Sequence, residues 1–396
     1  MSSHRSSHLR RLAPGLLTAL LATAVLAAGC TLPATPANLV NAVATLTATT
    51  PPSATSTAAA TTTPTAAVAA TAETATGDAA EVSGAPADPT AERDVWPIPL
   101  DVSASDAEQE YSAMAWYGDT LVLVPQFPAR DDNALVTLAR ADVLAYLRGE
   151  IDGPLPTGRI PFDDGNLAER ITGFEGYEAI GFDGDTVYMT VETHPGTWML
   201  GYIVAGTIDA DGITLDPALR TPVAVQAPLS NMTDETLVID GDRVLTIFEA
   251  NGVNVNPAAH ANVFSRGLEK LDPIPLPNVE YRLTDATALD DARRFWAINY
   301  FWPGDDKLEP ADDPIAATYG QGKTHAQGTV VERLLEFQVA DDGVTLTETP
   351  PIQLTLLPAG VARNWEGIAR LQDGDIDGFL LVTDKFPVTQ LAFVAR

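Results

Sequence analysis

The chain has little that could cross-link it and few positive charges. Cys30 is the single cysteine among 396 residues, so no intramolecular disulfide can form. Lys and Arg together number 23 against 53 Asp and Glu, which gives a formal net charge of −30. This charge argues against nucleic acid and anionic lipid surfaces as partners. The excess of acidic residues favours divalent cations as binding partners instead.

The N-terminus has the features of an export signal. Arg5, Arg10 and Arg11 precede an apolar run from Leu16 to Leu26, which is too short to span a bilayer. We therefore predict a signal peptide over residues 1–29. The sequence Ala27-Ala28-Gly29-Cys30 resembles the lipobox of bacterial lipoproteins, with Ala27 where Leu is usual. The resemblance implies lipidation of Cys30 and anchoring to the bacterial cell membrane on its extracytoplasmic side. The alternative is an ordinary signal peptide that ends near a cysteine.

Residues 30–93 have the composition of a tether. After Cys30 they are nearly all Ala, Thr, Pro and Ser, with no aromatic residue. Such a segment buries too little apolar surface to offset the entropy of ordering it, so we predict disorder.

From residue 94 to 396 the sequence changes to short β-rich runs separated by Gly, Asp, Asn and Pro, which predicts an all-β domain. One hairpin-like unit recurs in it, and the copies 178–192 and 235–249 align without gaps. Asp-Gly-Asp in several copies is a hairpin-turn signal. The five copies occupy residues 112–126, 178–192, 235–249, 285–299 and 366–384.

The repeat predicts a β-propeller, in which each copy supplies two strands of a four-stranded blade. Met199–Ile208 with Val223–Gln226, and Val330–Val339 with Val344–Leu346, read as further strands. Val95–Leu100 is expected to close the last blade beside Thr389–Val394, which leaves no free sheet edge. Five copies predict five blades, and a sixth could lie within Tyr300–Gln327. Ala139–Arg148 has helical spacing.

Each copy carries a polar residue at two fixed points, the start of its first strand and the end of its second. Antiparallel geometry places both sets at one end of the ring, around the mouth of the central channel. Converging carboxylates repel one another unless they are protonated or neutralised, and Ca²⁺ prefers oxygen ligands. One hypothesis is therefore a metal site, and the other is that each side chain caps backbone groups of a neighbouring blade. The ten positions are Ser112, Glu178, Glu235, Asp285 and Glu366, with Gln126, Glu192, Glu249, Asn299 and Asp384. The candidate metal ligands among them are Glu178, Glu192, Glu235, Glu249, Asp285, Asn299, Glu366 and Asp384.

Rings followed by proline come after several of these strand ends. Trp302-Pro303, Phe386-Pro387 and His194-Pro195 are examples, and Tyr300 stands just before the first. Proline ends a strand, so the ring could simply cover the end of the sheet. Alternatively, His194, Tyr300, Trp302 and Phe386 form a rim that binds a sugar or another flat apolar ligand.

Asn364-Trp365-Glu366-Gly367-Ile368, followed by Leu380–Asp384 and Thr389–Phe393, resembles the closing motif of the phytase-like (esterase-like phytase) propeller family. Phe174–Ile180 is similar to the same Glu-Gly-Ile entrance of a blade. A more distant resemblance is to propellers of the gluconolactonase and regucalcin type, and it implies Ca²⁺ at the acidic residues. Phytate itself is densely anionic and requires clustered Lys and Arg, which this chain lacks.

Two functions remain open at this point. The first is a surface-anchored, Ca²⁺-stabilised propeller that binds a small molecule or surface partner at its channel mouth without catalysis. The second is a hydrolase of phosphoesters, esters or lactones, in which a divalent metal held by the mouth residues lowers the pKa of bound water. We expect a monomer in either case.

Overall fold

The computed structural model describes residues 88–396. The predicted signal peptide, Cys30 and nearly all of the predicted tether lie outside these residues. Within them, no helix has the length and apolar character needed to cross a membrane.

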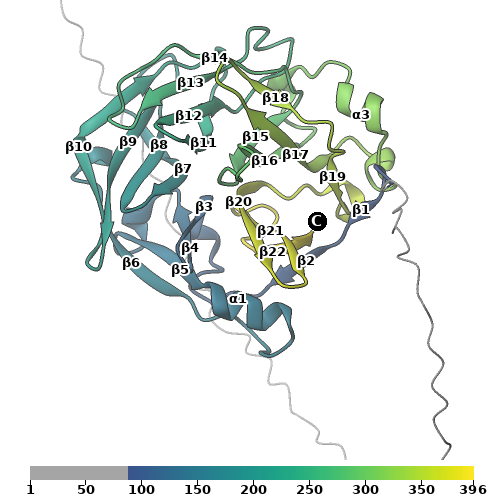
Figure 1. Cartoon of the computed structure of the whole chain (residues 1–396), viewed down its shortest axis with the longest axis horizontal. Helices are drawn as coiled ribbons and strands as arrows, with labels where there is room; N and C mark the ends of the chain where they lie inside the picture. Colours follow the sequence, from purple (N-terminus) through teal and green to yellow (C-terminus); the bar gives the residue numbers. More distant parts are fainter. Residues whose placement is uncertain (1–87) are drawn as a thin grey trace, which may run out of the picture. The chain divides into compact units, whose positions relative to one another are not determined.

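The described chain forms five groups of mainly antiparallel strands (Figure 1). The first group contains β3 (Tyr111–Tyr117), β4 (Thr120–Pro125), β5 (Ala134–Ala139) and β6 (Gly158–Asp163). The second contains β7 (Phe174–Asp183), β8 (Thr186–Thr193), β9 (Leu200–Asp209) and β10 (Gly212–Val223). The third contains β11 (Asp234–Asp240), β12 (Arg243–Phe248), β13 (His260–Ser265) and β14 (Ile274–Pro275). A short parallel contact between β6 and β10 joins the first two groups into one sheet.

The last two groups take strands from both ends of the described chain. The fourth contains β15 (Arg282–Ala286), β16 (Arg294–Phe301), β17 (Val331–Val339), β18 (Val344–Leu346), β19 (Ile352–Leu354) and β1 (Glu92–Arg93). The fifth contains β20 (Trp365–Asp373), β21 (Ile376–Thr383), β22 (Leu391–Ala395) and β2 (Val95–Ile98). Because β1 pairs with β19, the sheet structure begins before the boundary predicted at residue 94.

The first strands of the five groups form a closed ring. β3 contacts β7, β7 contacts β11, β11 contacts β15, β15 contacts β20, and β20 returns to β3. The other strands of each group lie outward from this ring (Figure 1). A ring of inner strands with antiparallel sheets radiating from it is a β-propeller, so the predicted all-β class and propeller architecture are confirmed.

The ring is closed by a strand from the start of the domain, as the sequence predicted. β2 pairs with β22 in antiparallel register, from Val95 opposite Val394 to Ile98 opposite Leu391. The predicted hairpins also occur, and their turn glycines Gly118, Gly184, Gly241 and Gly374 have φ between 55° and 60°. This left-handed conformation is why glycine recurs there.

Three predicted segments differ in detail. The predicted helix exists as α1 (Arg140–Leu147). The strand expected at Val223–Gln226 instead starts at Gly212 and ends at Val223, and β18 pairs with β17 as predicted.

No further group of strands lies in the described segment between Phe301 and Val331, so the prediction that a sixth blade could lie there was wrong. That segment forms η3 (Asp306–Leu308), α3 (Pro314–Tyr319) and η4 (His325–Gln327). The remaining short helices are α2 (Leu167–Arg170), η1 (Ala107–Gln109), η2 (Pro128–Arg130) and η5 (Pro358–Gly360).

The core lies between neighbouring sheets, where the apolar faces of successive groups meet. Tyr177 of β7 packs edge-on against Phe162 of β6, with their ring centroids 5.2 Å apart. Trp365 of β20 is fully buried, and its Nε1 donates a 2.8 Å hydrogen bond to Glu332. The polar ends of the inner strands are therefore positioned by tightly packed neighbouring sheets.

Candidate functional site at the channel mouth

A β-bulge lies at the first polar position of every repeat. The register of each inner hairpin shifts around Ser112, Glu178, Glu235, Asp285 and Glu366. A bulge leaves a residue without a ladder partner and turns its side chain out of the alternating pattern. The recurrence of the bulge therefore places Ser112, Glu178, Glu235 and Glu366 equivalently around the ring, whereas the fourth hairpin skips both Thr284 and Asp285.

A cavity of about 210 Å³ lies at this end of the ring. Seven of the ten predicted positions line it, which are Ser112, Gln126, Glu178, Glu192, Glu235, Glu366 and Asp384. Glu110, Tyr111, Asn231, Arg282, Asn364 and Lys385 complete its wall. The structure thus gathers most of the repeat's polar residues at one shared place, which we call the acidic cavity.

Two carboxyl groups of the acidic cavity have an unpartnered oxygen. Glu192 Oε1 and Glu235 Oε2 are buried and make no hydrogen bond. Glu178 differs, because its Oε1 accepts a 3.0 Å hydrogen bond from Gln126 Nε2. Buried polar atoms without partners are costly, so a water molecule or a bound group that contacts these oxygens would lower that cost.

A buried positive charge acts on both of these carboxyls and belongs to Arg282, which the sequence patterns did not identify. Its Nε forms an ion pair with Glu249, while Nε lies 3.8 Å from Asp305 and Nη1 lies 4.0 Å from Glu366. Burial alone lowers the pKa of Arg282, but Glu249, Glu235 and Glu366 together raise it well above its ordinary value. Arg282 therefore neutralises part of the acidic cluster. Arg282 lies just before the fourth copy of the repeat, at residues 285–299, so the repeat gave no signal for it.

Several predicted positions have structural partners instead of facing the cavity. Asp285 Oδ2 accepts a 2.9 Å hydrogen bond from the backbone N–H of Ile368, which links β15 to β20. Asn299 Nδ2 donates to the carbonyls of Glu280 and Arg282, and its Oδ1 accepts from Arg333. Neither residue lines the acidic cavity, and Glu249, paired with Arg282, does not line it either. The capping hypothesis thus describes part of the set.

Burial changes the protonation of the cavity carboxyls. It raises the pKa of Glu192 to about 8, with nearby Glu249 contributing to the shift. It also raises the pKa values of Glu178, Glu235 and Glu366 well above their ordinary range, and that of Asp384 in the same direction. At neutral pH, protonated carboxyl groups in the cavity can donate hydrogen bonds as well as accept them.

These pKa values predict that the free energy of unfolding decreases as pH rises towards 8. Between its ordinary pKa of 4.5 and its folded-state pKa of about 8, Glu192 keeps a proton in the folded protein that the unfolded chain releases. Raising the pH in this window therefore favours the unfolded chain. We expect the melting temperature to fall between pH 5.5 and pH 8.5, and Glu192→Gln to reduce the slope. A slope that the substitution leaves unchanged would show that Glu192 is ionised throughout.

An aromatic groove adjoins the acidic cavity. Its volume is about 510 Å³, and Tyr300, Trp302 and Phe386 contribute its rings. Arg282, Asp305, Gly360, Val361, Ala362, Asn364 and Pro387 complete the lining. Arg282 and Asn364 also line the acidic cavity, so the two spaces share a wall.

The fourth residue of the predicted rim lies elsewhere. His194 lines neither the acidic cavity nor the aromatic groove. Its Nδ1 is 3.7 Å from Glu175 Oε1, and its side chain is partly exposed. The structure therefore brings Tyr300, Trp302 and Phe386 together but leaves His194 outside this set.

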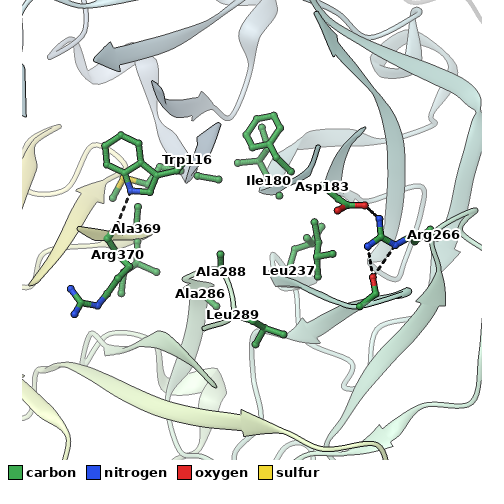
Figure 2. Close-up of a pocket in the computed structure, with 17 residues that line it drawn as sticks. Trp116, Ile180, Asp183, Leu237, Arg266, Ala286, Ala288, Leu289, Ala369 and Arg370 are labelled. Carbon is green, nitrogen blue, oxygen red and sulfur yellow. Dashed lines mark hydrogen bonds and ion pairs between the residues drawn. The ribbon is translucent and has the colours of Figure 1, made fainter. Parts of the chain in front are cut away.

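The opposite end of the inner strands has a different character (Figure 2). A cavity of about 310 Å³ there is lined mainly by apolar and small side chains, among them Ile180, Leu237 and Ala286. Trp116 Nε1 donates a 2.8 Å hydrogen bond to the carbonyl of Arg370, and Arg266 pairs with Asp183. None of the ten predicted polar positions lines this cavity.

Comparisons with known proteins give little beyond this geometry. No family model matches the chain, and no curated protein matches it. Among solved structures, a bifunctional GH43-CE protein of Bacteroides eggerthii is similar with a TM-score of 0.42 and 9% identity, over 76% of this chain and 34% of that one. This chain thus spans about a third of that protein. The catalytic domain of a GH62 alpha-L-arabinofuranosidase from Coprinopsis cinerea has a TM-score of 0.39 and 8% identity, over 76% and 96% of the two chains. An alpha-L-arabinofuranosidase from Clostridium thermocellum has a TM-score of 0.40 and 11% identity, over 68% and 80%.

Proposed function

We propose that this chain is a lipid-anchored, extracytoplasmic binding protein whose five-bladed propeller holds a ligand at the channel mouth. The lipobox-like sequence before Cys30 and the Ala/Thr/Pro-rich tether support anchoring and display away from the membrane. The closed ring of five inner strands supports the blade number. The net charge of −30 argues against nucleic acid as the ligand.

One observation supports ligand binding above the others. Arg282 and Asn364 line both the acidic cavity and the aromatic groove, so a ligand held against them can reach hydrogen-bonding groups and aromatic rings together. Small-molecule sites combine an apolar wall with a few convergent polar groups and enclose roughly 300–1,000 Å³. The groove, at about 510 Å³, falls within that range.

Calcium remains a proposal for the acidic cavity. Glu192 Oε1 and Glu235 Oε2 are unpartnered oxygens of the type that Ca²⁺ binds. In residues 88–396, however, no three His, Cys, Asp or Glu side chains converge tightly enough to hold a metal ion, and Arg282 already supplies positive charge. Calcium binding would therefore require these carboxylates to ionise and move together.

Calcium titration tests this proposal directly. At pH 8.5, we expect the melting temperature to be higher in millimolar Ca²⁺ than in a chelator, because the ion binds the folded protein alone. The double variant Glu192→Gln/Glu235→Gln should lose the difference. The exposed Glu150, replaced by Gln, should retain it. Equal melting temperatures with and without Ca²⁺ in the unsubstituted protein would rule out calcium, but not the binding of an organic ligand.

Metal-assisted hydrolysis is the second candidate and depends on the same oxygens. A bound divalent ion would polarise a substrate oxygen and lower the pKa of bound water. The cavity carboxyls with raised pKa values favour some acid–base role, since such values often occur at functional sites. A screen for hydrolysis of phosphoesters, esters and lactones is informative only if the calcium titration shows that the folded protein binds Ca²⁺.

A further inference from the structure

The aromatic groove presents two rings to solvent beside buried polar groups. The Trp302 side chain follows β16 and is 53% exposed, while Phe386 follows β21 and is 58% exposed. Large apolar side chains left exposed next to one another usually mark a binding surface. Here they lie over Arg282 and Asn364, which connect the groove to the acidic cavity.

Both rings are positioned by their own loops. A Cβ atom on Gly304 would overlap the indole ring of Trp302, so the glycine lets this ring lie against the backbone. Asp384 Oδ1 accepts a 2.7 Å hydrogen bond from the backbone N–H of Phe386. The carbonyl of Phe386 in turn accepts a 3.0 Å bond from the N–H of Asn364. A preorganised surface of this kind loses less entropy when a ligand binds.

The charges around the groove disfavour ionic ligands of either sign. Anions would meet the carboxylate of Asp305 at the groove wall. A cation over Trp302 or Phe386 would meet Arg282, and Lys385 Nζ already lies 5.8 Å from the centre of the Phe386 ring. A neutral ligand avoids both repulsions.

The polar groups of the wall include both donors and acceptors. Arg282 is a donor, Asp305 is an acceptor, and the Asn364 amide offers both kinds of group. Burial raises the pKa of Tyr300, so its phenol remains protonated and available as a donor. A ligand that matches this wall needs hydroxyl groups, which donate and accept, together with a flat apolar face for the rings.

We propose that the aromatic groove binds a neutral sugar ring, stacked on Trp302 and Phe386, with its hydroxyls directed to Arg282, Asp305 and Asn364. This inference rests on the proposed function, because it names the ligand class of the same mouth. It requires no metal and no catalytic step.

The test uses the whole chain with Cys30→Ser, titrated with neutral oligosaccharides of glucose, xylose, mannose and galactose. We expect at least one to bind and to shift the indole N–H resonance of Trp302, which is assigned by its loss in Trp302→Phe. Trp302→Ala and Phe386→Ala should each weaken binding at least tenfold. Trp198→Ala is the matched control, because Trp198 is 62% exposed but lines neither space. It should leave the affinity unchanged.

Gly304→Ala gives a second variant in which both rings are kept. The added methyl group displaces the Trp302 ring without removing buried surface, so we expect normal melting and weakened sugar binding. This outcome would separate a role in ligand binding from a role in folding.

Other outcomes overturn the inference in distinguishable ways. The sugar proposal is wrong if no oligosaccharide binds at about 10 mM. It is also wrong if neither Trp302→Ala nor Phe386→Ala changes the affinity. Tetramethylammonium or inositol hexakisphosphate binding at Trp302 in place of sugars would overturn it while leaving a ligand site at the mouth. Failure of these probes, combined with no effect of Ca²⁺ on melting, would contradict the proposed function as well.

Discussion

Replacing Arg282 with Gln is expected to lower the free energy of unfolding by about 3–5 kcal/mol, as is usual when one member of a buried ion pair is removed. Glu249, its ion-pair partner, has no exposed surface. The substitution would leave this carboxylate buried without a counter-charge. Glu366 and Asp305 lie within 4.0 Å of the guanidinium, so they would also lose the nearby positive charge. Urea denaturation followed by tryptophan fluorescence measures the change.

Two variants control for this result. Arg294 pairs with Asp290 at the surface, so Arg294→Gln should cost no more than about 1 kcal/mol. Adding Glu249→Gln to Arg282→Gln removes the stranded charge and should recover part of the lost stability. An Arg282→Gln protein as stable as the parent chain would mean that the acidic cluster is neutralised by protons rather than by this side chain.

Removing β2 is the change expected to affect the propeller most broadly. A chain that starts at residue 101 lacks the strand that pairs with β22, and it loses the buried side chains of Ile98 and Leu100. It also lacks β1, which pairs with β19 over two residues. Burial of each such side chain is worth about 1.5–3 kcal/mol. The hydrogen bonds between β2 and β22 are lost as well. We therefore expect the free energy of unfolding to fall by about 5 kcal/mol or more, which is comparable with the total stability of many domains.

A chain that starts at residue 88 keeps β1 and β2, and it serves as the control. We expect it to melt as the longer chain does, whereas the shorter one should melt at a much lower temperature or aggregate through the exposed edge of β22. In the full chain, Ile98→Asp should weaken closure without deleting any backbone. Similar melting of both truncated chains would show that the ring does not depend on β2.

The acidic cavity was only partly predictable. The recurrence of a polar residue at two points of each hairpin located Glu178, Glu192, Glu235, Glu366 and Asp384 at one end of the ring, because antiparallel pairing brings those points together. The same pattern also selected Asp285 and Asn299, which bond to the Ile368 N–H and to Arg333 instead. The repeat period predicts where on a strand a side chain is attached, but it does not predict which side chain or backbone group of a neighbouring blade it contacts.

Arg282 carried no comparable signal, whereas the sequence had marked the rings of the aromatic groove but not the rest of its wall. Arg282 lies outside the repeated unit, and its importance depends on Glu249 and Glu366, which come from other hairpins. The groove combines Trp302, Val361 and Phe386, which are separated along the chain and meet only when the fourth and fifth groups pack side by side. Local sequence patterns do not encode such contacts.

By itself, the sequence determined the hairpin repeat, the glycine turns and the strand that closes the ring, because each depends on local alternation of apolar residues and on backbone conformation. Only the tertiary structure decided which carboxyls share a cavity, that Arg282 neutralises part of them, and which of the predicted rim residues lie beside them. The physical reason is that pKa values, ion pairs and groove walls arise from burial among distant segments, and burial exists only once the ring has closed.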